Sequence, residues 1–184
     1  MYERCSSTDH SPVEKFMFDT LTRGITAPLR CTKPVACALD GHAIAGGFIL
    51  ALACDYLAIG TRKTFSVGVT ELPVGVPFPI IPMEILRHQL DPQYAHRLIF
   101  DGNLVPSTEF AVRGARGDQP DELAQKWLHM MAQRPLESFQ ITKKKWWNDR
   151  IRLDAVDNEQ ERKEYIRAIT SEGCLQAMKR TLKK

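Results

Sequence analysis

Apolar positions along the chain separate a first part with both strand and helix patterns from a second part with helix patterns only. Apolar residues recur at helical spacing over residues 13–31, and Pro28 marks the expected end of that helix. Short apolar runs bounded by turn residues predict buried strands at residues 33–39, 56–59 and 64–69. A run of small apolar residues, entered through glycines, predicts a buried helix at 45–54.

The middle of the chain is interrupted by prolines and glycines. Four prolines fall within residues 73–82, which predicts a shaped loop there. Turn residues at Asp101-Gly102 and a stop at Gly114 divide the helices expected next, at 83–90, 93–100 and 107–113. No strand pattern remains after residue 119, and amphipathic helices are expected at 120–132, 136–148, 155–169 and 172–182. We therefore expect an α/β core at 1–118 and a helical region at 119–184.

Composition narrows the class of protein. The 184 residues are 43% apolar and 26% charged, which is typical of a globular chain. The net charge of +3 is too small to indicate a nucleic-acid partner, and no apolar stretch is long enough to predict a membrane-spanning helix. The first residues do not resemble a secretory signal, and five cysteines without a CxxC pair predict free thiols. We expect a cytoplasmic protein or, in a eukaryote, one of the mitochondrial or peroxisomal matrix.

Two features could support catalysis. Ala45-Gly46-Gly47 joins a predicted strand to a predicted helix, where unpaired amides can stabilise an oxyanion. Close packing of helix on strand is the alternative, and the motif alone favours it. Glu71 lies in the apolar stretch 67–79, where desolvation would raise its pKa and make it a useful general base. A carboxylate satisfied by loop amides explains Glu71 equally well.

Other candidates are weaker. His42 is expected to be structural or exposed to solvent, and Cys54 to be a core thiol. The remaining histidines lack metal-ligand spacing, so no metal site is predicted. The basic and aromatic run at residues 143–147 could contact phosphates, but a solvated lysine face with docked tryptophans is favoured.

Residues 33–48 and 50–56 together resemble the enoyl-CoA hydratase/isomerase (crotonase) family. The resemblance covers roughly residues 30–184 and continues through Phe65, Glu71 and Gly75, through 98–102 and 111–114, and through Ser171-Glu172-Gly173. It implies an α/β fold built as a spiral of ββα units, followed by a helical trimerisation region. It also implies an acyl-CoA thioester substrate, a role in fatty acid metabolism, and no cofactor beyond the coenzyme A of the substrate.

The resemblance assigns roles to individual residues. The family holds the thioester oxygen with two backbone N–H groups, one of which falls on Gly46. The other belongs to an earlier segment not found in this sequence, so we expect the fold to be shortened at its N-terminus. Hydratases of the family carry two glutamates, and these positions are Ile49 and Glu71 here.

A site with a single glutamate resembles the sites of the Δ3,Δ2-enoyl-CoA isomerase branch, because moving a double bond requires one base. Ile49, Pro77 and Phe78 are the expected walls of the acyl pocket. An enoyl-CoA hydratase that uses another residue, and a shortened non-catalytic member that acts in assembly, are the alternatives.

The helical region predicts self-association. Its apolar stripes are Trp127, Leu128 and Met131; Phe139, Trp146 and Trp147; and Tyr165, Ile166 and Ile169. Faces of this extent are covered by a partner or by the same chain. The resemblance implies another copy, in a homotrimer or hexamer, whereas packing of these helices back over the α/β part is the alternative.

Overall fold

The first thirty residues form a nearly continuous helical segment. The computed structural model describes residues 1–110, 114–148, 151 and 159–182. After α1 (Tyr2–Cys5), the chain is helical through α2 (Ser11–Glu14), the π-helical η1 (Lys15–Leu21) and α3 (Thr22–Arg30). The predicted helix at 13–31 is confirmed, and Pro28 lies in its last turn, two residues before the end.

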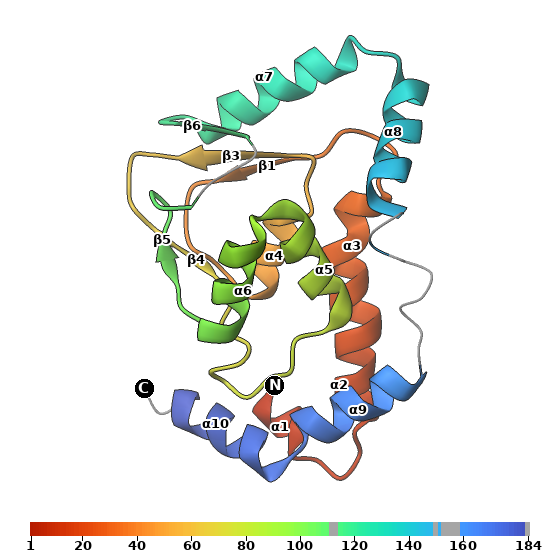
Figure 1. Cartoon of the computed structure of the whole chain (residues 1–184), viewed down its shortest axis with the longest axis vertical. Helices are drawn as coiled ribbons and strands as arrows, with labels where there is room; N and C mark the ends of the chain where they lie inside the picture. The colour runs from red at the N-terminus through yellow and green to blue at the C-terminus, as the bar shows by residue number, and fades with distance from the viewer. Residues whose placement is uncertain (111–113, 149–150, 152–158, 183–184) are drawn as a thin grey trace.

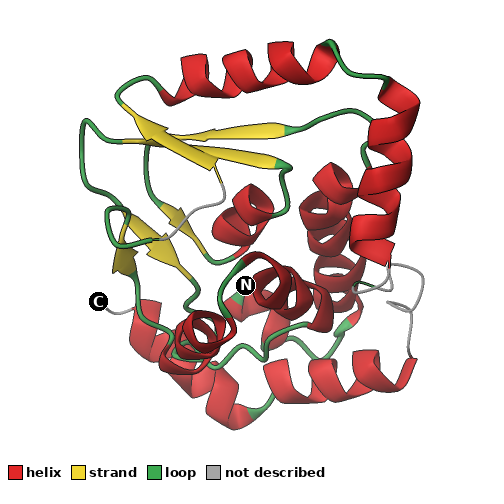
Figure 2. Ribbon diagram, turned by 45° about the horizontal axis from the view of Figure 1, so that its top comes forward, coloured by secondary structure: helices red, strands yellow, loops and turns green. Residues whose placement is uncertain are grey.

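Two small sheets organise the α/β part, and Figure 2 shows them as two separate groups of strands. The first joins β1 (Ala36–Leu39), β3 (Tyr56–Gly60) and β6 (Gly114–Gly117) in the order β1-β3-β6, with both pairings parallel. The second joins β2 (Ala43–Ile44), β4 (Ser66–Gly68) and β5 (Val105–Pro106) in the order β2-β4-β5. In this sheet β2 is parallel to β4, and β5 is antiparallel to it.

The three apolar strands are confirmed as β1, β3 and β4, whereas β2, β5 and β6 were not predicted. Two of the missed strands have only two residues, which is too short for a periodic pattern. The helix predicted at 107–113 is wrong over 107–110, because 107–109 form a turn and 110 is irregular, and 111–113 lie outside the described residues. Gly114 begins a strand instead of stopping a helix, because β6 pairs with β3.

Helices α4 (Gly46–Leu52), α5 (Ile80–Gln89) and α6 (Pro92–Asp101) confirm the other predictions for this part. The loop predicted at 73–82 ends earlier, at Pro79, where α5 begins. Pro82 fits the first turn of α5, where a backbone N–H has no helical acceptor. Asp91 caps α6 by accepting hydrogen bonds from the N–H groups of the second and third residues after it.

The second part is helical as predicted, with α7 (Pro120–Ala132), α8 (Leu136–Asn148), α9 (Glu159–Ile169) and α10 (Glu172–Leu182). Residues 155–158 of the third predicted helix lie outside the described residues. Helix α7 covers the β1-β3-β6 sheet at the top of Figure 1, where Trp127 stacks on Tyr56 with ring centroids 4.9 Å apart. Helices α9 and α10 lie at the opposite end, beside α1 and α2.

The apolar stripes of these helices are covered unevenly. Trp147 is buried in the main core with residues of α4, β3 and α5. Tyr165 and Ile169 are buried in a second cluster, together with residues of α1, α2, η1 and α10. Trp146, by contrast, is 50% exposed on α8. Packing of these helices against the rest of the chain therefore buries some of the apolar stripes. An exposed apolar surface remains on α8.

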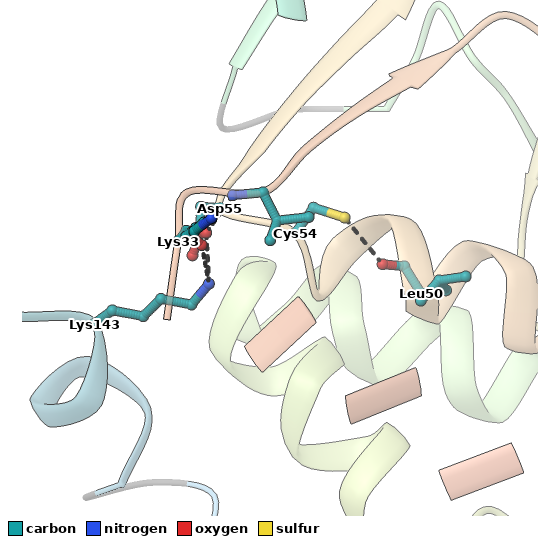
Figure 3. A network of polar contacts seen from close by, with 6 residues as sticks. Lys33, Leu50, Cys54, Asp55 and Lys143 are labelled. Carbon is teal, nitrogen blue, oxygen red and sulfur yellow. Dashed lines mark hydrogen bonds and ion pairs between the residues drawn. The ribbon is translucent and has the colours of Figure 1, made fainter. Parts of the chain in front are cut away.

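A buried ion pair fastens α8 to the sheet (Figure 3). The Nζ of Lys143 lies 2.6 Å from the Oδ2 of Asp55, which also accepts a hydrogen bond of 2.9 Å from the N–H of Val35. The side chains are only 5% and 11% exposed. Burial raises the pKa of Asp55, and the ammonium of Lys143 offsets only part of that rise. The prediction of a solvated lysine face is wrong for Lys143 because this carboxylate gives its ammonium a buried partner, although Lys144 is exposed.

Lys143→Met should destabilise the protein by about 3 kcal/mol near neutral pH, because it leaves the carboxylate of Asp55 buried without its countercharge. The loss should shrink as the pH falls through the pKa of Asp55, since the protonated carboxyl needs no countercharge. Urea unfolding at several pH values measures both effects. Lys144→Met is the control and should change stability by less than about 0.5 kcal/mol. Equal stability of the two variants would contradict a structural role for the pair.

Candidate active site

The pairing of two short parallel strands brings the two candidate catalytic segments to one edge. Ala43 of β2 is opposite Val67 of β4, and Ile44 is opposite Gly68. The chain leaves both strands at the same edge, because parallel strands share the direction of their carboxyl ends. Beyond this edge β2 leads into Gly46, and β4 leads into Glu71. Gly46 and Glu71 therefore follow neighbouring strand ends, although 25 positions separate them in the sequence.

Ala45 forms the turn between β2 and α4 in a strained conformation. Its φ is 55° and its ψ is −130°, and it is the one non-glycine residue with a positive φ among those described. Its N–H donates to the carbonyl of Gly68 at 2.8 Å, while its carbonyl accepts from the N–H groups of Phe48 and Ile49. Within the described structure, the N–H groups of Gly46 and Gly47 donate to no protein group. Such amides can stabilise an oxyanion, and that role for Gly46 stays a prediction.

Glu71 begins a tight turn, and its side-chain carboxylate is partly buried. The carbonyl of Glu71 accepts a 2.8 Å hydrogen bond from the N–H of Val76. Its Oε2 is buried and has no hydrogen-bond partner among the described residues. Burial raises the pKa of Glu71, and the backbone amides of Glu71 and Thr70 offset part of the rise. Both ideas from the sequence thus apply in part: loop amides lie near the carboxylate, but one oxygen remains unpaired.

The expected acyl-pocket residues lie in or beside the main core. Ile49, on α4, is only 1% exposed, and Phe78 packs against the same cluster. Pro77 is half-buried in the loop before α5. Nothing in these positions tests their role in binding an acyl chain, which stays a prediction.

Residues of the first long helix also approach Gly46, and the sequence did not identify them as site residues. A Cβ at Gly46 would lie 3.4 Å from the Cδ1 of Leu21 and 3.8 Å from the Cδ1 of Ile25. The two side chains are four positions apart and so share one face of the helix. Their helical spacing could be seen in the sequence. It predicts that this face of the helix is buried, but it does not show that the face covers Gly46.

The two weaker candidates, His42 and Cys54, each form a hydrogen bond with a backbone group. His42 is exposed, and its Nδ1 accepts a hydrogen bond from the N–H of Ser66 at 3.0 Å. Cys54 is half-buried instead of lying in the core, and its thiol donates to the carbonyl of Leu50 (Figure 3). All five cysteines are free thiols, as predicted.

The described residues contain no cluster of three or more potential metal-ligating His, Cys, Asp or Glu side chains. In the same residues, no helix is long and apolar enough to cross a bilayer. A cavity of about 250 Å³ lies beside α8 and the ion pair, lined in part by Phe139, Trp146 and Trp147. Neither Gly46 nor Glu71 lines this cavity, so it is separate from the candidate site.

Comparison with known proteins identifies the family. The family model for enoyl-CoA hydratase/isomerase matches residues 6–165, and the chain belongs to that family. The chain is 27% identical over 150 residues to (E)-benzylidenesuccinyl-CoA hydratase of Thauera aromatica. This match covers 76% of the chain and 58% of the hydratase, so the chain spans less than two thirds of that relative's length.

Solved structures show that the fold is the crotonase fold, as the sequence resemblance implied. Human mitochondrial delta3-delta2-enoyl-CoA isomerase superposes with a TM-score of 0.87 at 16% identity, covering all of this chain and 72% of the isomerase. An enoyl-CoA hydratase from Mycobacterium avium has a TM-score of 0.75 at 23% identity, covering 94% and 70% of the two chains. Methylmalonyl CoA decarboxylase also has a TM-score of 0.75, at 14% identity, with coverage of 92% and 70%.

Ala45→Gly should leave stability unchanged or raise it by about 1 kcal/mol, because glycine adopts this positive φ without strain. Ala51→Gly is the matched control within the same helix, and it should destabilise by about 1 kcal/mol or more. Urea unfolding of both variants tests the comparison. If Ala45→Gly destabilised as much as Ala51→Gly, the turn at Ala45 would not be strained.

Proposed function

We propose that this chain carries the general base of an acyl-CoA double-bond isomerase, converting a 3-enoyl-CoA into a 2-enoyl-CoA. The observation that supports it is the buried oxygen of Glu71, which has no hydrogen-bond partner in the described part of the chain. Glu71 follows the strand next to the one that leads into Gly46. Apolar Ile49 occupies the position where the sequence resemblance places the second glutamate of a hydratase. One carboxylate beside oxyanion donors suits a proton shift better than the addition of water.

The reaction moves one proton and one double bond. The carboxylate of Glu71 removes a proton from C2, and the electron pair of that bond shifts towards the thioester oxygen to give an enolate. The N–H of Gly46 donates a hydrogen bond to this oxygen as its negative charge develops. Glu71 then returns the proton to C4, which leaves the double bond between C2 and C3. The atoms balance without a cofactor or metal, and coenzyme A acts as the thiol part of the substrate.

The burial of Glu71 contributes to this chemistry. A carboxylate whose pKa is raised is a stronger base than one in water, and it stays ionised only above that pKa. The rate should therefore fall as the pH drops through the pKa of Glu71. The apolar side chains of Leu21 and Ile25 near Gly46 would exclude water from the enolate.

Glu71→Gln should lower kcat/KM for a 3-enoyl-CoA by about 10²–10⁴-fold, because the amide cannot accept the C2 proton. The appearance of the conjugated 2-enoyl thioester measures turnover by absorbance. Glu84→Gln is the matched control, since the partner of Glu84 among the described residues is Arg87 on the same helix, α5, and this variant should retain full activity. Unchanged turnover in Glu71→Gln would exclude Glu71 as the base.

Hydration of a 2-enoyl-CoA is a second candidate, favoured by the relative that is named a hydratase. It requires a group other than Ile49 to assist the addition of water. Disappearance of the conjugated thioester with formation of a 3-hydroxyacyl-CoA would support hydration and contradict the isomerase proposal. Absence of turnover with either thioester would contradict both proposals and favour the non-catalytic alternative.

We also propose that the protein assembles as a trimer or a dimer of trimers through the exposed surface of α7 and α8. Four apolar side chains on these two helices are about half exposed: Met130, Leu136, Ile141 and Trp146. Exposed apolar groups gathered along two consecutive helices are typical of an interface. A ring of identical copies buries such a face without forming filaments.

Light scattering should therefore give a mass near three or six times the 20.9 kDa of one chain. Ile141→Glu should reduce the mass, because it places a charge in the apolar face. Lys144→Glu alters an exposed polar position on the same helix and should leave the mass unchanged. A monomeric wild-type protein at micromolar concentration would contradict the assembly.

A further inference from the structure

The loop that carries Glu71 is docked on the C-terminal helices. Gly75, with φ of 80°, lies so close to α10 that an added Cβ would be 2.9 Å from the Cα of Cys174 and 3.0 Å from the Cβ of Ala177. The side chain of Val76 packs against the second hydrophobic cluster. Because Val76 also closes the turn of Glu71 by its backbone hydrogen bond, this cluster lies against the loop that carries Glu71.

Tyr165 of α9 belongs to that cluster and carries a hydroxyl that can donate a hydrogen bond. It is 6% exposed, and its ring contacts Phe18 edge-on, with centroids 5.3 Å apart. Its hydroxyl is buried and has no hydrogen-bond partner in the part of the chain that the structure describes. The sequence assigned Tyr165 to an apolar stripe, which accounts for the ring but not for the hydroxyl.

The hydroxyl of Tyr165 is a hydrogen-bond donor and the Oε2 of Glu71 is a hydrogen-bond acceptor, so the two atoms could pair. A phenol has a proton to donate, and an ionised carboxylate has lone pairs to accept it. A buried polar atom without a partner costs about 1–3 kcal/mol, so a bond between the two atoms would relieve both costs. Val76, which is hydrogen-bonded to the carbonyl of Glu71, packs against the cluster that contains Tyr165. In keeping with this packing, the negative charge of Glu71 is the largest influence after burial that raises the pKa of Tyr165. Tyr165 thus remains a protonated donor wherever Glu71 acts as a base.

We propose that Tyr165 is a positioning residue for Glu71: its hydroxyl donates a hydrogen bond to the buried carboxylate oxygen when that side chain turns towards α9. The bond orients the base and stabilises its ionised form against burial. The catalytic meaning of this pairing rests on the proposed function, but the pairing itself does not. It makes the base depend on a helix that begins 88 positions later in the sequence.

The other titratable groups around Tyr165 do not compete for this role. The thiols of Cys5 on α1 and Cys174 on α10 face it, and burial raises the pKa of both, so they stay neutral at working pH. Arg162, also on α9, forms ion pairs with Glu14 of α2 and Asp19 of η1. Of these titratable groups, Glu71 is the one that offers the phenol an ionised oxygen without a partner among the described residues.

Tyr165→Phe should raise the pKa of Glu71 by about one pH unit, because the ionised carboxylate loses a hydrogen bond while the ring packing is retained. The measurement is a pH titration of the side-chain carboxyl carbons of ¹³C-labelled glutamate by NMR, with Glu71→Gln used to assign the signal. This readout does not depend on turnover, so it tests the pairing even if the isomerase proposal fails. In an active protein, the acid limb of the kcat/KM profile should move in the same direction.

Tyr94→Phe is the matched control. The hydroxyl of Tyr94 is also buried without a partner among the described residues, but the charges near it are Glu109 and Arg97. This variant should leave the titration of Glu71 unchanged. Equal midpoints in wild type and Tyr165→Phe, or an equal shift in Tyr94→Phe, would overturn the proposal.

A second measurement covers the case in which Tyr165→Phe fails to fold. Full-length wild-type protein labelled with 3-fluorotyrosine carries a more acidic phenol, which is a stronger donor. The pKa of Glu71 should then fall, and labelled Tyr94→Phe should show the same fall as labelled wild type, because the label on Tyr94 does not act on Glu71. An unchanged Glu71 midpoint in the labelled protein would also overturn the pairing.

Discussion

The candidate site depends on the parallel pairing of β2 with β4. Each of these strands is very short, yet their register places the turn at Ala45 and the loop of Glu71 at the same edge. The hydrogen bond from Ala45 to Gly68 extends the pairing by one residue and holds the backbone where the N–H groups of Gly46 and Gly47 remain unpaired. Without this pairing, nothing would require the start of α4 and Glu71, 25 positions apart, to follow neighbouring strand ends.

The burial of the Glu71 carboxylate, which the proposed function would use, opposes folding. A partly buried carboxylate with an unpaired oxygen and an alanine at positive φ both cost free energy. The surrounding packing offsets these costs: α4 and α5 bury a large apolar core beside the site, and α9 and α10 close over the loop. The ion pair of Lys143 with Asp55 fastens α8 to the sheet. Strain at the site is thus maintained by contacts on several other elements.

The fold alone does not decide the reaction. Structures named as an isomerase, a hydratase and a decarboxylase share this fold with the chain at 14–23% identity. A common backbone can support different chemistry because the reaction follows from a few side chains at the strand ends. The residues at positions 49 and 71 are therefore more informative about activity than the superposition.

The amino-acid sequence by itself determined the family, the longer helices, the three apolar strands, and Gly46 and Glu71 as candidates. Periodicity and turn residues are local signals, and they were sufficient for these features. They failed where long-range contacts decide the outcome: Gly114 pairs with β3 instead of ending a helix, and Lys143 is buried by a carboxylate 88 positions away. Tyr165 was read as an apolar residue because no local pattern shows which buried atom its hydroxyl faces. Only the tertiary structure places α9 beside the loop of Glu71, since that contact joins segments almost a hundred positions apart.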